Sequence, residues 1–426
     1  MERRRFFEYM FGASALSVMS INKLNASIYE SIELLNSKYL QDDSPDGPYW
    51  DAIRKNFLFT DDIIMMNNGT LGAMPKPVYN TLMKYFKVQT TNPYECYNFF
   101  PQIKGEVKNK LARFVNAGVD EVAITRNTTE GMNVIASGLE YKKGDEIIIS
   151  TQEHPSGLQP WKLAEKRYGL KIIEIPLGSP PKSVDEIIAD FSNAITSRTK
   201  VISVSHTNFI TGLIFPTKEL SEITRKKNIL FAVDAAHAIG MLNLDMKELG
   251  IDLFASSAYK WLGTPTGCGL LYVRKEVQDK IWPNITTGGW DREGAGKFES
   301  LGQRADPLIF AFGEAIDFHN KIGKGRVERR IQTMAGHLKK ELERIPKVRI
   351  HTSMDPYLSA GLTAFSIEGV APQTIVDYVR EKYNIIIRTI GRDRDNTKGV
   401  RVSTNIFVTI KHVDLLLEGV NYLARR

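Results

Sequence analysis

The residues best placed to do chemistry stand at the ends of two apolar runs. The run over residues 229–233 ends at Asp234, and the run over 251–255 leads through two serines and Tyr259 to Lys260. Each run has the length and composition of a buried strand. In an open α/β sheet, the carboxyl ends of parallel strands meet at one crevice where ligands bind. We therefore expect a carboxylate, the imidazole of His237, hydroxyl groups and a single lysine amine to converge.

This set of groups matches what pyridoxal 5′-phosphate requires of a protein. Its aldehyde needs an amine for a Schiff base, its pyridine nitrogen needs an acid that keeps it protonated, and its phosphate needs hydrogen-bond donors. Asp234 would also serve as an ordinary helix cap, and Lys260 as a surface lysine. Their combination at two neighbouring strand ends favours the cofactor site.

The strands that must position these groups belong to a repeating strand–helix pattern. Further strands are predicted over residues 121–125, 146–150, 171–175, 200–204 and 267–273, with helices over 129–138 and 157–168. Strands that are apolar on both faces are typical of a mostly parallel sheet covered by helices. The later part of the chain differs, with helices predicted over 309–320, 325–345, 372–382 and the C-terminus, and strands over 362–367, 385–388 and 399–403.

The pattern therefore predicts two main domains. Residues 61–306 are expected to form a large α/β domain, and residues 307–426 a smaller α+β domain. Residues 28–60 are expected to be a mixed segment that packs with the small domain. A chain of 426 residues is long enough for two or three such units.

The N-terminus carries its own signal. Arg3, Arg4, Arg5 and two phenylalanines precede a mildly apolar run, an order that resembles a twin-arginine export signal. An ordinary basic amphipathic start is the alternative. Residues 1–27 are therefore expected to be a signal segment and the protein to be periplasmic, with a cytoplasmic location as the other option.

Composition argues against several other classes of function. The chain has 56 basic and 49 acidic residues, a net charge of +7, and its basic residues are scattered and form no nucleic-acid-binding motif. It has no run of 18 or more uncharged apolar residues, so a membrane span is not expected. Its two cysteines, Cys96 and Cys268, have no metal-ligand spacing, and no disulfide is expected between them. No metal, nucleic acid or membrane partner is predicted.

The motifs, taken together and in order, resemble those of the fold-type-I pyridoxal phosphate enzymes of the aminotransferase class V family, most closely its isopenicillin N epimerase-like branch. The resemblance runs from about Met65 to Val408. It implies a mostly parallel seven-stranded sheet in the large domain. It also implies a homodimer with a shared active site, in which Thr287 reaches the phosphate bound by the partner subunit.

The resemblance also implies a role for each residue that would contact the cofactor. Lys260 would form the Schiff base and move protons at the substrate Cα, Asp234 would pair with the pyridine nitrogen, and His154 would stack on the ring. The remaining groups would bind the phosphate or the phenolic oxygen: Thr128, Thr129, Ser257 and Tyr259 for the phosphate, Asn208 and His237 for the oxygen. The pair of threonines opens a predicted helix, and a helix N-terminus suits a phosphate. Two positions depart from the family: desulfurases usually have glutamine at His237, and histidine is usual at Tyr259.

The substrate implied by the resemblance is a small amino acid. Arg401 matches the arginine that binds the substrate carboxylate, for which a guanidinium fork is suited. Asn68 and Arg388 are further candidates for the substrate pocket.

The lack of a cysteine at one position narrows the range of reactions to be considered. Desulfurases of this family carry a nucleophilic cysteine on a small-domain loop, and the corresponding loop over 389–399 contains no cysteine. The chemistry that remains begins with deprotonation of Cα, and the resemblance favours an epimerase or racemase. A C–S lyase and an aminotransferase are the alternatives, and Tyr94, Tyr97 and Tyr259 are candidates for an acid on the opposite face. A non-enzymatic regulator is disfavoured, because both Lys260 and Asp234 are present and no DNA-binding domain is added.

Overall fold

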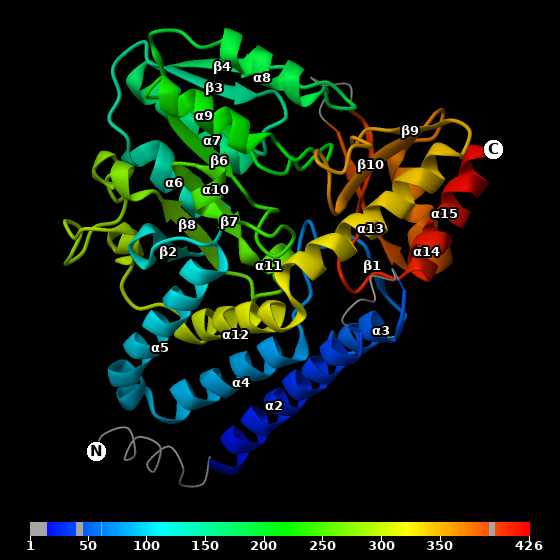
Figure 1. Cartoon of the computed structure of the whole chain (residues 1–426), viewed down its shortest axis with the longest axis horizontal. Helices are drawn as coiled ribbons and strands as arrows, with labels where there is room; N and C mark the ends of the chain where they lie inside the picture. Colours follow the sequence, from blue (N-terminus) through cyan, green and yellow to red (C-terminus); the bar gives the residue numbers. More distant parts are fainter. Residues whose placement is uncertain (1–14, 40–45, 61, 392–396) are drawn as a thin grey trace.

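The computed structural model describes residues 15–39, 46–60, 62–391 and 397–426, with side chains described from residue 22 onward. It has a large sheet domain, a smaller domain beside it and a layer of long helices along one side (Figure 1). None of the helices in these ranges has the length and apolar character that a membrane crossing requires. Arg3 and Arg4 lie outside the described residues, so the export signal stays a prediction.

The large domain contains the expected seven-stranded sheet. Its strands lie in the order β2 (Val122–Thr125), β8 (Gly269–Val273), β7 (Leu253–Ser257), β6 (Leu230–Asp234), β5 (Thr199–Ser205), β3 (Glu146–Ser150) and β4 (Lys171–Ile175). Strand β8 runs antiparallel to both β2 and β7, and every other neighbouring pair is parallel. The central strands are buried along their whole length because they are apolar on both faces. The prediction of a mostly parallel sheet is confirmed.

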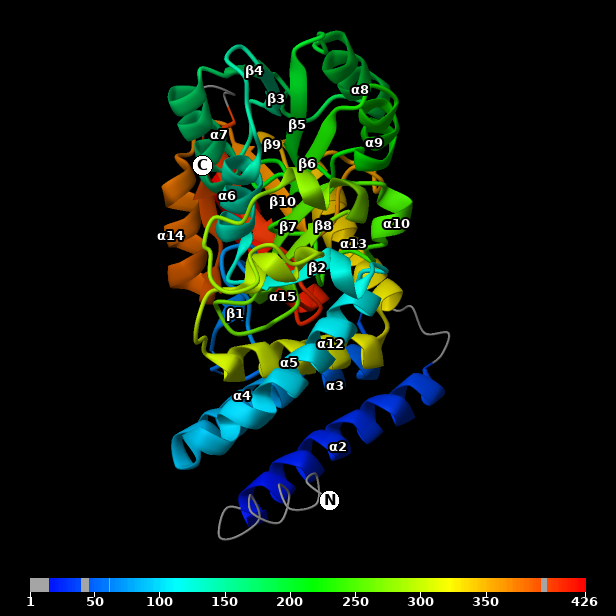
Figure 2. The same ribbon diagram turned by 90° about the vertical axis from the view of Figure 1, so that its left-hand side faces the viewer.

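Helices cover both faces of this sheet (Figure 2). Helices α6 (Thr128–Gly138) and α7 (Pro155–Tyr168) lie on one face, while α8 (Val184–Asn193), α9 (Thr217–Lys226) and α10 (Met246–Leu249) lie on the other. The short helix α11 (Ala258–Trp261) follows β7 directly. Three short 3₁₀ turns, η1 (Val119–Glu121), η2 (Lys275–Lys280) and η3 (Ala295–Glu299), complete this domain.

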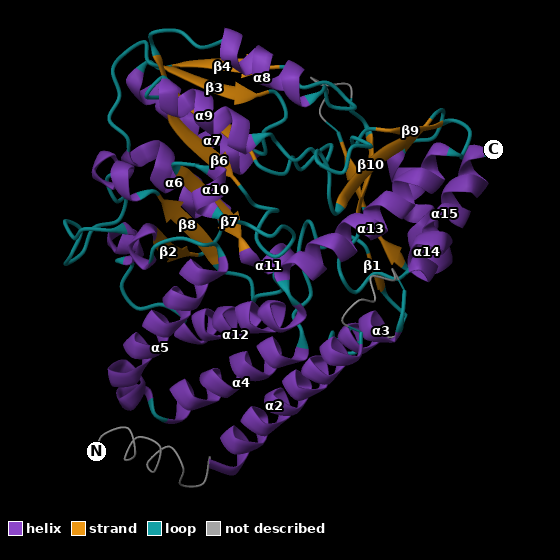
Figure 3. Ribbon diagram, viewed as in Figure 1, coloured by secondary structure: helices purple, strands orange, loops and turns teal. Residues whose placement is uncertain are grey.

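The small domain is built on a four-stranded antiparallel sheet (Figure 3). Its strands lie in the order β12 (Arg388–Ile390), β13 (Gly399–Ser403), β10 (Leu362–Ile367) and β9 (Val348–Ile350), with helices α13 (Lys324–Glu343), α14 (Pro372–Tyr383) and α15 (Ile410–Ala424). Where the sequence predicted a single strand over 385–388, the structure has two strands, β11 and β12. The first of these, β11 (Ile385–Ile386), pairs in parallel with β1 (Ile64–Met65) and brings the segment after β1 to the small domain.

The remaining long helices form a separate layer below the large sheet in Figure 1. Helix α12 (Asp306–Ile322) packs against α4 (Lys76–Thr91) and α5 (Pro93–Phe114), and α2 (Ala15–Lys38) packs against α4 and α12. The region around α3 (Pro48–Arg54) contacts the small domain, where Asp46 accepts a hydrogen bond from the Ile410 amide. The domain limits stay predictions, since β1 and α12 each join parts of the chain assigned to different units.

Candidate active site

The two segments singled out in the sequence meet at the carboxyl edge of the large sheet. Asp234 is the last residue of β6 and Ser257 the last of β7, and these strands are neighbours. In the sheet register, Asp234 lies between Ser205 of β5 and Ala255 of β7. Because α11 starts immediately after β7, Lys260 is held close to the same edge. This is the crevice where a ligand of an open α/β sheet binds.

The amine of Lys260 lies in a site that favours its neutral form. The pKa of this amine is lowered to about 8: burial is the largest cause, the charge of Asp234 opposes the shift, and the positive charges of Arg401 and Arg388 add to it. Burial disfavours an ammonium ion, and a neutral amine is the form that attacks an aldehyde. Near neutral pH this lysine is therefore far more nucleophilic than a surface lysine.

This pKa predicts how the apoenzyme recovers its cofactor. We expect the rate of pyridoxal phosphate attachment to rise with pH, with a midpoint near 8, because only the neutral amine reacts. Replacing Arg388 with glutamine removes a charge that lowers the pKa, so the midpoint should move to higher pH. Stopped-flow absorbance over pH 6–10 measures both midpoints, and a midpoint near 10.4, the value of an ordinary lysine, would contradict the assignment.

His237 lies next to this amine, with its Nε2 3.5 Å from Lys260 Nζ. Burial holds the pKa of His237 well below its usual range, so its ring is neutral. Its Nδ1 accepts a hydrogen bond from the indole N–H of Trp261 at 3.2 Å. A neutral imidazole carries one proton, so that proton must sit on Nε2 and face the Lys260 amine. The tryptophan beside the lysine thus fixes the tautomer, a role that the sequence did not reveal.

One carboxylate oxygen of Asp234 accepts a hydrogen bond, and the other has no hydrogen-bond partner. Its Oδ1 accepts a hydrogen bond from the Ala236 amide at 3.1 Å, while the buried Oδ2 has no partner. Burial raises the pKa of this carboxyl, and the Ala236 bond and the charge of Lys260 act against that rise. A buried carboxylate oxygen without a donor is costly, and a protonated pyridine nitrogen would supply one. The residues present therefore fit pyridoxal phosphate.

The space in front of Asp234 depends on Gly157 at the start of α7. A Cβ at this position would lie 2.8 Å from Asp234 Oδ2, closer than a carbon–oxygen contact allows. Because the residue has no side chain, the carboxylate keeps its position and its free oxygen. The sequence could not show this contact, since the two residues are far apart along the chain.

We expect Gly157→Ala to weaken cofactor retention by about 10- to 100-fold, as overpacking of this size costs about 1–3 kcal/mol. The matched control is Gly336→Ala, also in a helix, where a Cβ would meet nothing within 4 Å. The control should bind the cofactor normally. Fluorescence titration of the two apoenzymes with pyridoxal phosphate measures the difference, and equal affinities would contradict the proposed position of Asp234.

His154 stands at the N-cap of α7, on the loop that follows β3. Its Nδ1 accepts a hydrogen bond from the Ser156 amide at 3.2 Å, and its ring meets Phe209 edge-on at 4.8 Å. Its neighbour Glu153 is fully buried and accepts hydrogen bonds from the hydroxyls of Ser150 and Ser205. Burial raises the pKa of Glu153 to about 7. Glu153 was not predicted as a site residue, and its bonds fix the loop that carries His154. The stacking role of His154 stays a prediction.

Only two of the predicted phosphate-binding residues, Thr128 and Ser257, are seen in contact. Thr128 and Ser257 lie side by side, with the Thr128 amide 3.0 Å and its hydroxyl 2.9 Å from the Ser257 hydroxyl. Tyr259 is half-buried, while Thr129 and Thr287 are exposed. Among the described residues, the hydrogen bond of Thr287 is local: its carbonyl accepts from the Trp290 amide.

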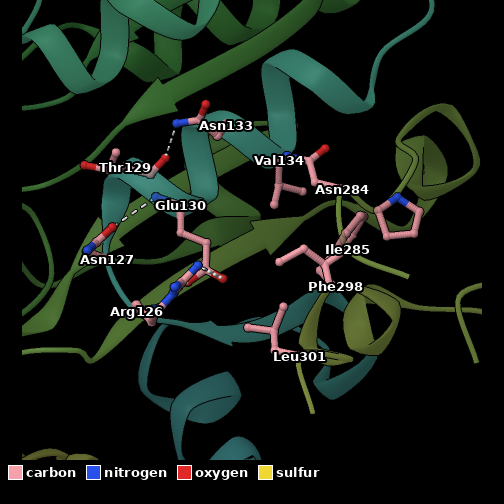
Figure 4. Close-up of a pocket in the computed structure, with 11 residues that line it drawn as sticks. Arg126, Asn127, Thr129, Glu130, Asn133, Val134, Asn284, Ile285, Phe298 and Leu301 are labelled. Carbon is pink, nitrogen blue, oxygen red and sulfur yellow. Dashed lines mark hydrogen bonds and ion pairs between the residues drawn. The ribbon is translucent and has the colours of Figure 1, made fainter. Parts of the chain in front are cut away.

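A surface pocket of about 430 Å³ lies beside the N-terminus of α6 (Figure 4). Thr129 lies on one wall, and Asn284 and Ile285, from the segment that leads to Thr287, lie on another. Arg126 and Glu130 contribute an ion pair of 3.1 Å. Neither the lysine nor the aspartate of the candidate site lines this pocket, so it lies outside the crevice.

Arg401, the residue predicted to bind the substrate carboxylate, has a buried guanidinium. Arg401 is 1% exposed, and its Nη1 donates to the Phe209 carbonyl at 2.8 Å, while its Nε and Nη2 have no partner. Asn68 is completely buried, and neither its Oδ1 nor its Nδ2 has a partner. The turn that carries Asn68 lies against Arg401, because a Cβ on the adjacent Gly69 would lie 2.9 Å from Arg401 Nη2, so the two residues belong to one cluster. Buried polar atoms are rarely left unpaired, so this cluster is suited to a polar ligand.

Other candidates have different surroundings. The side chain of Asn208 is engaged in its own loop, where it donates to the Gln152 carbonyl and accepts from two backbone amides. One N–H of its amide remains for a ligand.

Tyr94 and Tyr97 are 77% and 68% exposed at the start of α5, and Figure 1 places this turn far from α11. Within one subunit they are therefore poor candidates for the acid on the opposite face.

A sheet of this order with a half-buried lysine at its carboxyl edge is typical of the fold-type-I pyridoxal phosphate enzymes. Comparison with known proteins narrows this class to one family. Residues 64–416 match the aminotransferase class-V family, and the chain belongs to it. The protein is accordingly a pyridoxal phosphate-dependent enzyme.

Its relatives have more than one activity. A probable cysteine desulfurase of Pyrococcus abyssi is 29% identical over 357 residues, which cover 79% of this chain and 86% of the relative. The isopenicillin N epimerase of Streptomyces clavuligerus is 26% identical over 393 residues, which cover 88% and 98%. Among solved structures, C-DES with glycine covalently linked to its pyridoxal phosphate cofactor superposes with a TM-score of 0.78 at 22% identity, covering 86% of this chain and 98% of that one.

Proposed function

We propose that this enzyme removes the α-proton of an amino acid and acts as an epimerase or racemase. The observation that carries the proposal is the Lys260 amine, whose pKa burial lowers to about 8, in a crevice with the unpaired guanidinium atoms of Arg401. The likeness to isopenicillin N epimerase over 88% of the chain also supports it.

Each residue contributes a separate function to this chemistry. Arg401, with Asn68 beside it, binds the substrate carboxylate and sets the direction of the Cα–H bond. Lys260 takes the α-proton once its amine is neutral and unattached. When bound, pyridoxal phosphate supplies an electron-withdrawing ring that accepts the electrons left at Cα. Asp234 would hold the proton on the ring nitrogen, and His237 presents its Nε2–H on the side of the lysine.

A C–S lyase is the second candidate, favoured by the desulfurase relatives. A persulfide carried on the enzyme would need a reactive thiol. Cys96 and Cys268 are both buried and free, and burial raises their pKa to about 11 and about 12. Thiols in such surroundings are inert, so elimination that releases the sulfur product directly is the form of lyase chemistry left open. An aminotransferase reaction is the third candidate.

One experiment distinguishes these activities. The holoenzyme is incubated with a panel of L-amino acids in deuterated water, and Cα deuterium, chirality, pyruvate, sulfide and ammonia are followed. Deuterium uptake with inversion supports the epimerase. Pyruvate with a sulfur product supports the lyase, and accumulation of the pyridoxamine form supports the aminotransferase. If no amino acid exchanges its α-proton, the proposal is wrong.

We also propose that the enzyme works as a homodimer in which Thr287 contacts the partner's phosphate site. Trp282, Ile285 and Trp290 expose about half of their surface near this threonine, at 50%, 48% and 46%. Apolar groups gathered in this way fit a protein interface. Light scattering of the holoenzyme should give twice the mass of the chain, and a monomer would contradict the proposal.

The twin-arginine interpretation gives a proposed periplasmic location. Fractionation of cells that express the chain with Arg3 and Arg4 replaced by lysine tests it. An unchanged location would contradict it.

A further inference from the structure

A second arginine, Arg388, lies directly across the sheet from Arg401, the residue proposed to bind the substrate carboxylate. Arg388 of β12 and Arg401 of β13 are Cα partners in an antiparallel pair. Residues paired in this way have their side chains on the same face of the sheet, and two like charges at such a position destabilise it. Neither guanidinium forms an ion pair with any described carboxylate: Arg388 donates to the Thr389 carbonyl and Thr70 hydroxyl, Arg401 to the Phe209 carbonyl. Among the described residues, the sheet therefore brings two positive charges together with no carboxylate paired to either.

Both arginines reach the same turn of the chain, which follows β1. Arg401 Nη2 lies against Gly69, and Arg388 Nη1 is 3.3 Å from the Thr70 hydroxyl. This turn borders the reactive lysine, because the Gly72 amide donates to the Tyr259 carbonyl at 2.9 Å. A Cβ on Gly72 would lie only 2.1 Å from the Lys260 carbonyl oxygen. Arg388 is exposed, and through this turn it borders the active site.

The charges around the substrate position do not balance. Lys260, Arg401 and Arg388 are basic, and the charge of Arg388 lowers the pKa of both other groups. The described acids nearby are Asp234, whose free oxygen would pair with the pyridine nitrogen, and Glu153, which is bonded to serine hydroxyls. One substrate carboxylate would pair with Arg401 and leave Arg388 without an anion in the part of the chain that the structure describes.

We propose that the substrate is an amino acid with a second acidic group, which Arg388 binds while Arg401 binds the α-carboxylate. The inference rests on the proposed function and names its substrate class. The second group is a carboxylate or a similar oxyanion on the side chain. A guanidinium suits such a group because its N–H fork pairs with two oxygens at once.

Dicarboxylates without an amine test this proposal apart from the reaction, since they engage the two arginines and cannot react with the cofactor. Binding to the holoenzyme, whose phosphate site is filled, is measured by calorimetry for succinate against butyrate and for glutarate against pentanoate. We expect at least one dicarboxylate to bind about tenfold or more tightly than its matched monocarboxylate. In Arg388→Gln this preference should disappear while the monocarboxylate affinity stays the same. Arg388→Lys, which keeps the charge without the fork, should keep part of the preference.

Equal affinities for the two kinds of acid would overturn the proposal, and so would a preference that survives in Arg388→Gln. A parallel assay of α-proton exchange compares aspartate with asparagine and glutamate with glutamine, pairs that differ in side-chain charge. We expect at least one acidic member to exchange tenfold or more faster than its amide. If the binding preference is found but no amino acid exchanges its proton, the proposed function fails and the anion site stands.

Discussion

Replacing Lys260 with alanine is expected to abolish both cofactor attachment and catalysis. The variant has no amine to capture the aldehyde and no base at the α-proton, so exchange of that proton should fall by roughly 10⁴-fold or more. The isolated variant should be colourless, whereas the wild type treated with borohydride should carry a reduced cofactor on the peptide that contains Lys260. Absorbance, peptide mass spectrometry and deuterium exchange measure the three effects.

Two lysines are suitable controls for this experiment. Lys275 is exposed and should be replaceable by alanine without effect. Lys339 is the more demanding control, because burial also lowers its pKa to about 8. It lies in the small domain, where its Nζ donates to the Ser353 carbonyl and the Ser359 hydroxyl. Attachment of the cofactor to Lys339, or a yellow Lys260→Ala variant, would show that the reactive amine has been misassigned.

The sequence was sufficient to predict the arrangement of the large sheet. Strands that are apolar on both faces have little choice of position, and β3, β4, β10 and β13 begin and end where the pattern predicted. Because β6 ends at Asp234 and β7 at Ser257, at the same edge of the sheet, the meeting of Asp234 with the Lys260 segment also followed. The resemblance to the family made the assignment of cofactor and enzyme class specific, and the family match confirms both.

The sequence was insufficient where a role depends on the direction of one bond or on an empty space. The tautomer of His237 is set by the indole N–H of Trp261, and no sequence pattern states which way an indole points. The position of Asp234 requires a missing side chain at Gly157, a contact between distant residues. The split of the strand over 385–388 arises because its first half pairs with β1, which no local pattern could reveal. This split also places Arg388 opposite Arg401.

Asp234→Asn is expected to separate cofactor attachment from catalysis. The carboxamide has nearly the same shape but no charge, so Lys260 can still capture the aldehyde and the variant should remain yellow. A neutral group cannot hold a proton on the ring nitrogen, and the ring then accepts electrons from Cα less readily. Loss of a preorganised charge in a buried site costs about 10²- to 10³-fold in rate, and we expect α-proton exchange to fall by at least this much.

Asp234→Asn should also change the pKa of Lys260 in a direction that the structure defines. Asp234 raises the pKa of Lys260, so its neutralisation should lower that pKa and move the midpoint of cofactor attachment below 8. The matched control is Glu153→Gln, which neutralises the other buried carboxyl of the same edge without facing the ring. That variant should lose less than about tenfold in exchange rate, since its hydroxyl partners can bond to an amide as well. If Asp234→Asn and Glu153→Gln lost activity equally, or if the midpoint rose in Asp234→Asn, burial alone and not the facing carboxylate would control this site.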